Sequence, residues 1–178
     1  MIETRIVNVV VTAFLNQKPD FEELRKCKEI FQDPEVYGGR VAYFKKEKMQ
    51  GSVSIFTSGK MIGVGTKSER EAFNELETTV QFLAEKGYIK PVKISPKIRN
   101  IVVTADFKRS LNLRRLSDAS KAIYEPKQFP GAILRLKSPY KTSILVFASG
   151  KVVVTGLRNE NQIEPTMQKL KHLLELEE

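Results

Sequence analysis

Short apolar runs and two longer apolar stripes divide the chain into predicted strands and helices. Residues 6–14 are rich in β-branched side chains, as is typical of a strand. Further strands are expected at residues 40–44, 53–56 and 60–64. The last two are joined by a tight Ser58-Gly59 turn. This pattern predicts a sheet of several short, neighbouring strands.

Two helices are expected in the same half of the chain. Asp20 followed by Glu23 is a helix start signal, and we expect three apolar residues of this helix to face inward: Phe21, Leu24 and Ile30. Cys27 is expected to be buried on the same helix. Ser68 and Glu71 form a capping box before a longer helix, whose apolar stripe consists of Phe73, Leu76, Val80 and Leu83.

The second half of the chain repeats the first in diverged form. Residues 7–13 recur at 99–105 and residues 55–60 at 146–151, with a looser match between residues 33–39 and 125–131. Gly65 matches Gly156. Because the offset stays at 91 or 92 residues, we predict one structural unit built twice. We expect residues 1–90 to form the first repeat, residues 91–178 the second, and the two together one continuous unit.

The helices of the second repeat follow from the same comparison. Its first helix should begin after Asn112 and turn Leu113, Leu116 and Ala119 inward. Its last helix carries an apolar stripe of Ile163, Met167, Leu170 and Leu174, with Pro165 in the first turn, where proline is tolerated. Residues 90–97, which contain two prolines, link the repeats. The single His172 should face outward on the last helix.

One face of the predicted sheet has nothing to cover it. Side chains alternate along a strand, so Val7, Val9 and Val11 share one face. Asn8, Val10 and Thr12 share the other. Near the end of the second repeat, the strand at residues 151–155 shows the same alternation. Helices can cover only one of these faces, so each repeat should present an open, partly apolar face rimmed by basic residues, as expected of an interaction surface.

Charge and composition narrow the function. The formal net charge is +9, and the excess lies in residues 90–178, which hold 17 basic and 8 acidic residues. A basic face favours nucleic acid or another polyanion, although a basic surface can also serve solubility alone. One histidine and one cysteine cannot build a zinc site or a nucleophilic triad. We therefore expect no enzyme, no metal and no cofactor. No segment is apolar enough to span a membrane, and no signal peptide is expected.

The repeated blocks resemble the TATA-binding protein family, especially its compact archaeal form. The resemblance covers nearly the whole chain and is most specific over residues 124–136 and 147–156. It implies an α+β fold: a saddle in which two repeats share a ten-stranded antiparallel sheet, with four helices on the convex face. It also implies double-stranded, A·T-rich promoter DNA in the minor groove as the partner.

The resemblance assigns roles to individual residues. Asn8 and Asn100 would donate to base acceptors, assisted by Thr155, because A·T pairs offer only acceptors in the minor groove. The residues that would lie against base edges are Val10, Ile62, Val102 and Val153. Two aromatic pairs would wedge into base steps: Tyr37 with Phe56, and Phe129 with Phe147. Four basic residues would contact phosphates: Lys60, Arg135, Lys141 and Lys151.

The resemblance also implies protein partners, and it shows departures. Transcription factor B would contact Tyr124, Glu125 and the position of Lys127, where archaeal relatives carry glutamate; RNA polymerase would follow indirectly. In the first repeat, Tyr43 stands in place of a phosphate-contacting arginine and Val64 in place of the threonine that matches Thr155. Gly38 and Gly39 replace a more rigid flank beside Tyr37. Weak self-association without DNA is left open.

Several interpretations remain at this point. Without the resemblance, Phe56 and Phe147 would be core residues, the two asparagines would blunt a sheet face, and the lysines would be ordinary residues after a turn. With it, the leading hypothesis is a general transcription initiation factor that binds and bends promoter DNA, located with the chromosome inside the cell (nucleoid if archaeal, nucleus if eukaryotic). The alternatives are a diverged paralog with altered DNA specificity and a protein-interaction module that has lost tight DNA binding.

Overall fold

The structure is a computed structural model that describes residues 2–175. Contacts between residues divide it into two compact units. The first unit consists of residues 8–99, and the second of residues 1–7 together with residues 100–178. Strand β1 (Glu3–Phe14) therefore begins in the second unit and ends in the first.

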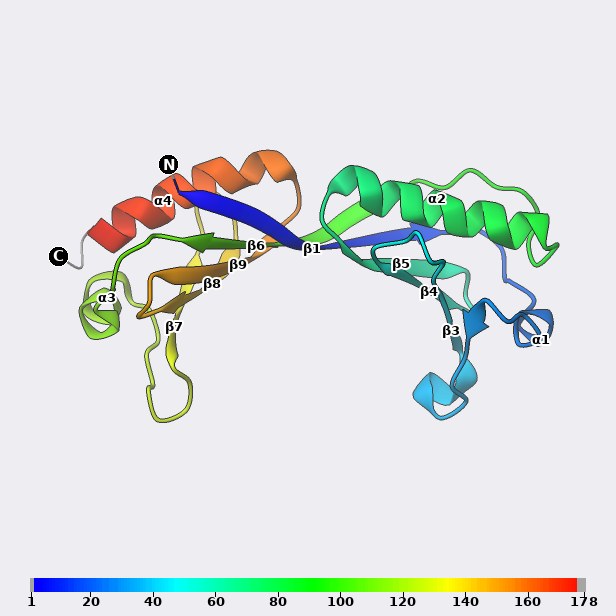
Figure 1. The fold of residues 1–178 in the computed structure, drawn as a ribbon, viewed down its shortest axis with the longest axis horizontal. Coiled ribbons are helices and arrows are strands. Elements are labelled where there is room, and N and C mark those ends of the chain that lie inside the picture. Colours follow the sequence, from blue (N-terminus) through cyan, green and yellow to red (C-terminus); the bar gives the residue numbers. More distant parts are fainter. Residues whose placement is uncertain (1, 176–178) are drawn as a thin grey trace. The chain divides into compact units, whose positions relative to one another are not determined.

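The first unit is a sheet with a long helix on one face. Its strands follow the hydrogen-bonded order β2-β3-β4-β5-β1, and the neighbours pair antiparallel. After β1, its elements are α1 (Phe21–Leu24), β2 (Ile30–Phe31), the 3-10 turn η1 (Val36–Gly39), β3 (Val41–Phe44), β4 (Ser52–Phe56), β5 (Lys60–Thr66) and α2 (Glu69–Glu85). Figure 1 shows α2 lying along one face of these strands.

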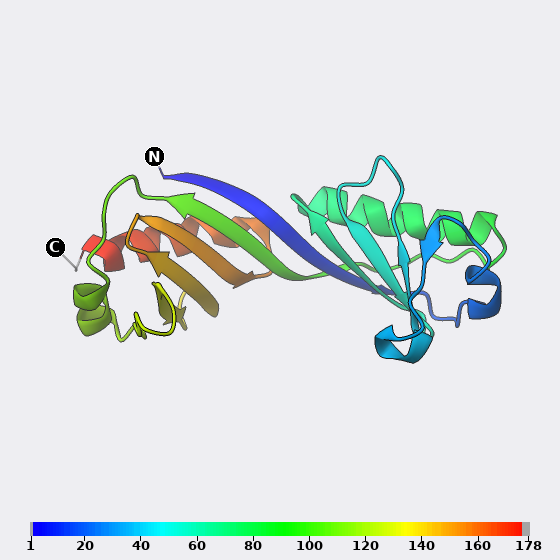
Figure 2. The ribbon, with the colours of Figure 1, turned by 60° about the horizontal axis from the view of Figure 1, so that its bottom comes forward.

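The second unit repeats this plan. The start of β1 is followed in the sheet by the order β6-β9-β8-β7. Its elements are β6 (Lys97–Asp106), α3 (Leu113–Ser120), β7 (Gly131–Leu136), β8 (Thr142–Phe147), β9 (Lys151–Leu157), the 3-10 turn η2 (Glu160–Gln162) and α4 (Ile163–Glu175). Figures 1 and 2 show α4 along one face of this sheet, as α2 is in the first unit.

The helices begin where the sequence predicts. Asp20 accepts hydrogen bonds from the backbone N–H groups of Glu22 and Glu23, and the Ser68 hydroxyl accepts one from Glu71. These bonds satisfy N–H groups that have no partner within the helix. Half of the predicted capping box is wrong, because the Glu71 carboxylate accepts from the N–H of Lys67 rather than that of Ser68.

The first helix is shorter than predicted. It ends at Leu24, because the N–H groups of Lys26 and Cys27 bond to carbonyls three residues back, which tightens the last turn. Cys27 is buried as expected, but it lies in the following loop and not on a helix. Ile30 is buried as the first residue of β2. In the second repeat Ala119 is exposed, contrary to prediction, since α3 ends one residue later.

Among the described residues there are nine strands, not ten. The missing strand is the counterpart of β2, at Ile123, which forms a single bridge with Ile133. The carbonyl before it, that of Ala122, accepts a hydrogen bond from the Ser117 hydroxyl and is engaged outside the ladder. This edge of the second unit therefore has one bridge where the first unit has a strand.

The core of each unit lies between its helix and its sheet. In the first unit Leu76 and Leu83 of α2 are fully buried against the sheet, and the rings of Phe44 and Phe82 stack at 4.6 Å. In the second unit Leu170 and Leu174 of α4 are fully buried. Phe73 and Ile163 of the predicted stripes are half-buried, and His172 is exposed as expected. None of the helices in the described part combines the length and apolar character needed to cross a bilayer.

Candidate nucleic-acid interface

Each unit leaves one sheet face without a helix. In the first unit Val9, Val11 and Ala13 are buried under α2, while Asn8 and Val10 are half-exposed on the other side. In β9 of the second unit, Val152 and Val154 are buried, whereas Val153 and Thr155 are half-exposed. The predicted alternation is therefore confirmed for these residues, but Val7 is 41% exposed and Thr12 is buried, contrary to the prediction. We call the helix-free side of each sheet its open face.

Two asparagines occupy matched positions on these open faces. Oδ1 of Asn8 accepts a hydrogen bond from the Gly65 N–H at 2.7 Å, and Oδ1 of Asn100 accepts one from the Gly156 N–H at the same distance. Because a backbone N–H can only donate, the oxygen of each amide must face it. This leaves the NH2 group of each side chain as the end that can donate.

The two glycines that hold these amides have backbone angles that suit glycine. Gly65 has φ +96° and Gly156 has φ +103°, in the region that side chains disfavour. A Cβ added at Gly156 would lie 2.9 Å from the carbonyl oxygen of Lys141. Both ladders also shift register beside the asparagine, between Val9 and Val11 and between Ile101 and Val103. A bulge next to each asparagine therefore brings a backbone N–H within reach of its side chain.

Thr155 adds a hydroxyl to one asparagine only. The NH2 of Asn100 donates to the Thr155 hydroxyl at 3.1 Å. In the first unit the matching position is Val64, which is exposed and has no hydroxyl. Asn8 thus offers both amide protons, whereas Asn100 shares one with Thr155.

Apolar side chains surround the asparagines. Four predicted base-contacting residues are half-exposed on the open faces: Val10, Ile62, Val102 and Val153. Thr12 and Ile62 are opposite each other in the β1–β5 ladder, as are Thr104 and Val153 in the β6–β9 ladder. The Arg99 guanidinium donates to the Thr12 hydroxyl at 2.8 Å, a contact that the sequence did not predict.

Each unit carries one of the predicted aromatic pairs. The ring centroids of Tyr37 and Phe56 are 6.4 Å apart, and those of Phe129 and Phe147 are 5.9 Å apart, both in edge-to-face geometry. The loops that carry Tyr37 and Phe129 extend from their sheets on the side away from α2 and α4 (Figure 1). We call these loops, residues 32–40 and 124–130, the first and second stirrup.

Between its aromatic residue and the strand that follows, the first stirrup has two residues more than the second. Gly131, two residues after Phe129, is opposite Phe147, whereas Phe56 is opposite Val41, four residues after Tyr37. Consecutive positive φ angles at Tyr37, Gly38 and Gly39 accommodate the extra residues. Tyr37 is 69% exposed.

This difference corrects the predicted place of Tyr43. Tyr43 is opposite Ser54, whose counterpart Leu145 is opposite Ile133, so Tyr43 corresponds to Ile133 and not to Arg135. The position that corresponds to Arg135 is Lys45, the residue after β3. Lys45 is exposed, and its ammonium group donates to the carbonyl of Gln50 at 3.4 Å. The sequence comparison missed this lysine because it did not place the two extra residues.

The predicted phosphate contacts lie at strand ends. Lys60 begins β5 and Lys151 begins β9, each after a hairpin turn, and Arg135 and Lys141 flank the β7–β8 hairpin. Lys151, Arg135 and Lys141 are exposed, and Lys60 is half-exposed. All four can therefore reach a polyanion.

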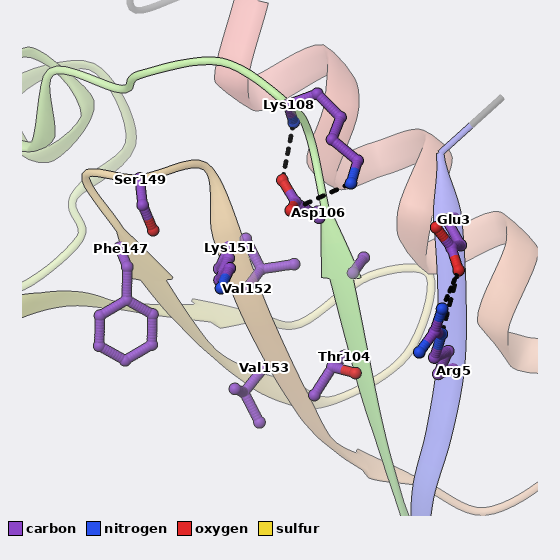
Figure 3. Close-up of a pocket in the computed structure, with 11 residues that line it drawn as sticks. Glu3, Arg5, Thr104, Asp106, Lys108, Phe147, Ser149, Lys151, Val152 and Val153 are labelled. Atoms are coloured by element: carbon purple, nitrogen blue, oxygen red, sulfur yellow. Dashed lines mark hydrogen bonds and ion pairs between the residues drawn. The ribbon is translucent and has the colours of Figure 1, made fainter.

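A hollow of about 520 Å³ lies beside Lys151 in the second unit. Its lining includes Phe147 and Val153 together with two ion pairs, Glu3 with Arg5 and Asp106 with Lys108 (Figure 3). The pKa of Asp106 is lowered, mainly because its carboxylate accepts the backbone N–H of Lys108, with a smaller effect from the Lys151 charge. This hollow thus combines predicted DNA-contacting residues with two carboxylates.

Both folded units carry an excess of positive charge. Among the described residues, the first unit holds 16 basic and 12 acidic residues, and the second 14 basic and 7 acidic. Lys90, Lys93, Lys97 and Arg99 belong to the first unit, whereas the charge count over residues 90–178 had included them in the second half of the sequence. The charge asymmetry of the sequence halves is therefore not a property of the folded units.

The three predicted partner residues lie together at the start of the second stirrup. Tyr124 is half-buried, and Glu125 and Lys127 are exposed. The Glu125 carbonyl accepts the N–H groups of Gln128 and Phe129, which closes a turn and leaves both charged side chains at the surface.

Comparison with known proteins gives one consistent result. The family model described as "Transcription factor TFIID (or TATA-binding protein, TBP)" matches residues 3–86 and 95–176. A TATA-box-binding protein of Cenarchaeum symbiosum is 41% identical over 160 residues, which cover 89% of this chain and 87% of that protein. A TATA-box-binding protein of Methanococcus aeolicus is 36% identical over 178 residues, which cover 99% of this chain and 97% of that protein. The solved structure of Methanococcus jannaschii TBP superposes with a TM-score of 0.85 and 32% identity, and covers 97% of this chain and 98% of that one.

Proposed function

The chain belongs to the TATA-binding protein family, and from this premise we propose that it is a general transcription initiation factor. In this proposal it binds A·T-rich promoter DNA through the minor groove and bends it. Both units contact the same duplex through their open faces and act as one DNA-binding unit. The protein acts with the chromosome, inside the cell.

The fixed amides of Asn8 and Asn100 carry this proposal. In each, the oxygen accepts a backbone N–H, so the NH2 group is the end of the amide that can donate. The minor groove of an A·T pair presents only acceptors, adenine N3 and thymine O2, and a G·C pair adds the guanine amino group. Outward donors surrounded by apolar side chains match the A·T groove and leave the guanine amino group without a partner.

The aromatic pairs supply the means of bending. An apolar wedge that enters a base step unstacks it and kinks the duplex, and the larger contact surface on bent DNA offsets this cost. The two pairs extend from the open faces at the stirrups, where each ring is already held against its neighbour. We assign insertion to Tyr37 with Phe56 and to Phe129 with Phe147.

Energy transfer between dyes at the two ends of a duplex tests binding and bending together. We expect transfer to increase when the protein is added to an A·T-rich duplex and to change little with a G·C duplex of equal length. Phe147→Ala should greatly reduce the increase, while the matched variant Phe107→Ala, at a half-buried residue outside the aromatic pairs, should leave it unchanged. Equal transfer with both duplexes would reject minor-groove recognition of A·T pairs.

We further propose that the second stirrup recruits transcription factor B, and RNA polymerase through it. Tyr124, Glu125 and Lys127 form the contact. Lys127 places a positive charge beside Glu125, which weakens attraction for a basic partner surface. Lys127→Glu should therefore strengthen the ternary complex with DNA and a factor B of an archaeal relative, measured by gel shift. A weaker complex would show that this protein has its own matched partner or docks differently.

A second candidate function is that of a diverged paralog with altered DNA preference. The longer first stirrup and the valine at position 64 favour it, because they change the wedge and remove a hydroxyl donor in one unit only. Selection of bound sequences from random duplexes, with and without factor B, separates the two candidates. A selected site in which only one half shows a clear sequence preference would support the paralog.

A further inference from the structure

The last residue pairs of the β1–β5 and β6–β9 ladders occupy matching positions in the repeat but differ in charge. At the end of β1, Phe14 is opposite Lys60 in the ladder with β5. At the end of β6, Asp106 is opposite Lys151 in the ladder with β9. We call Phe14 with Lys60 the phenyl corner, and Asp106 with Lys151 the carboxylate corner. The same kind of lysine thus faces a ring in one unit and an acid in the other.

Both corners belong to the open faces. The residue pair next to the phenyl corner, Ala13 with Met61, is buried under α2, so Phe14 and Lys60 point to the other side. Ala105 and Val152, next to the carboxylate corner, are likewise buried. Phe14 is 51% exposed, so its ring is accessible to a ligand of the open face.

The carboxylate corner is held in a charge-balanced state. The Asp106 carboxylate accepts the Lys108 N–H at 2.8 Å and pairs with the Lys108 ammonium group at 3.5 Å. Glu3 adds a second carboxylate to the same hollow, paired with Arg5 (Figure 3). A phosphate that approaches Lys151 therefore meets two carboxylates as well as the cations of Arg5 and Lys108, which are already paired with them.

The phenyl corner has no such acids. The positions that match Glu3 and Asp106 in the first unit are Ser95 and Phe14. Within residues 2–175, neither Lys60 nor Lys151 forms an ion pair, so the two corners differ in the carboxylates that lie nearby. A phosphate beside Lys60 meets its full charge, and the ring of Phe14 next to it can cover the apolar side of a deoxyribose.

We propose that the phenyl corner, Phe14 with Lys60, is the stronger backbone anchor of the DNA surface, and that Asp106 keeps the matching Lys151 contact weak. The inference rests on the proposed function, since the ligand of both corners is the phosphate and sugar of duplex DNA. It assigns Phe14 to the DNA surface and gives Asp106 a role in limiting affinity at one end. The two units then hold the DNA backbone with unequal strength, although their lysines match.

A double-mutant cycle tests this proposal with an A·T-rich duplex and fluorescence anisotropy. Lys60→Ala should weaken binding more than Lys151→Ala. In the background of Asp106→Asn, the loss caused by Lys151→Ala should grow by about 1.4- to 5-fold, the range for one exposed charge pair. Asp106→Asn alone should tighten binding by a similar factor. Glu164→Gln, which removes one exposed charge from α4, is the control for general charge effects.

The reciprocal change provides a second measurement. Phe14→Asp should reproduce the carboxylate corner in the first unit and reduce the loss caused by Lys60→Ala, whereas Phe14→Leu should largely keep the binding of the unaltered protein. An equal loss from Lys151→Ala with and without the Asp106 charge would overturn the proposal. If the unaltered protein does not prefer the A·T-rich duplex over a G·C duplex, the proposed function fails instead.

Discussion

An asparagine amide can face either way, and in this chain a backbone N–H decides its direction. The Gly65 N–H binds the oxygen of Asn8, and the Gly156 N–H binds that of Asn100. The preorganised NH2 groups need no reorientation when they meet base acceptors. The repeat in the sequence indicated that both asparagines matter, but the sequence alone could not show which atom of each amide is free.

Replacing only the NH2 group of Asn8 tests whether this group donates to base acceptors. Asn8→Asp keeps an oxygen for the Gly65 N–H and places a second, charged oxygen where the NH2 group was. Since the A·T minor groove presents only acceptors, we expect affinity for an A·T-rich duplex to fall about 5- to 150-fold, equivalent to about 1–3 kcal/mol for one base contact. Anisotropy titration measures the change, and an unaltered melting temperature confirms the fold. Unchanged affinity would mean that Asn8 does not face the bases.

The bulge beside each asparagine depends on a glycine. Gly156→Ala should destabilise the protein because φ +103° disfavours a side chain and the new Cβ would lie 2.9 Å from the Lys141 carbonyl. Gly87→Ala is the matched control, because it has φ +77° but no atom within 4 Å of the added Cβ. We expect the control to lose about 1–2 kcal/mol, the cost of the left-handed conformation, and Gly156→Ala to lose more. Chemical denaturation measures both, and equal losses would show that the close contact at Gly156 is relieved without cost.

The two stirrups differ in length and in the residues that follow their aromatic side chains, and this difference should affect how the protein bends DNA. Pro130 follows Phe129 in the second stirrup, whereas Gly38 and Gly39 follow Tyr37 in the longer first one. Insertion must order the glycines and must give the Tyr37 hydroxyl a partner or a water. We therefore expect Phe129→Ala to reduce end-to-end energy transfer sharply and Tyr37→Phe to leave it unchanged or increase it. The opposite ranking would make the first stirrup the principal wedge.

Helices and central strands could be predicted from the sequence, but irregular segments could not. Caps at Asp20, Ser68 and Asn112 are local signals, and the structure has all three. The early end of α1, the single bridge at Ile123 and the longer first stirrup depend on backbone hydrogen bonds and on pairing between strands. Such pairings are set by tertiary structure, which explains why Lys45 was missed and Tyr43 misplaced.

At the scale of the whole molecule, the distribution of charge depends on where the linker folds. Counted by sequence halves, the excess of +9 belongs to residues 90–178. Counted by folded units it is shared, because the basic linker residues belong to the first unit. Continuing the alternation of β1 to its end would have identified Phe14 on the open face, and the repeat matches it with Asp106. Only the structure shows that Asp106 lies in a charged hollow.

The central claim is that the two units read the minor groove of A·T pairs, and one substitution in the DNA tests it most directly. Replacing every A·T pair of the preferred site by inosine·cytosine changes the major groove but keeps a minor groove without the guanine amino group. We predict that this duplex is bound and bent almost as well as the A·T duplex, measured by anisotropy and end-to-end energy transfer. The corresponding G·C duplex should be bound much more weakly. If the inosine duplex behaves like the G·C duplex, recognition does not occur through the minor groove and the account is wrong.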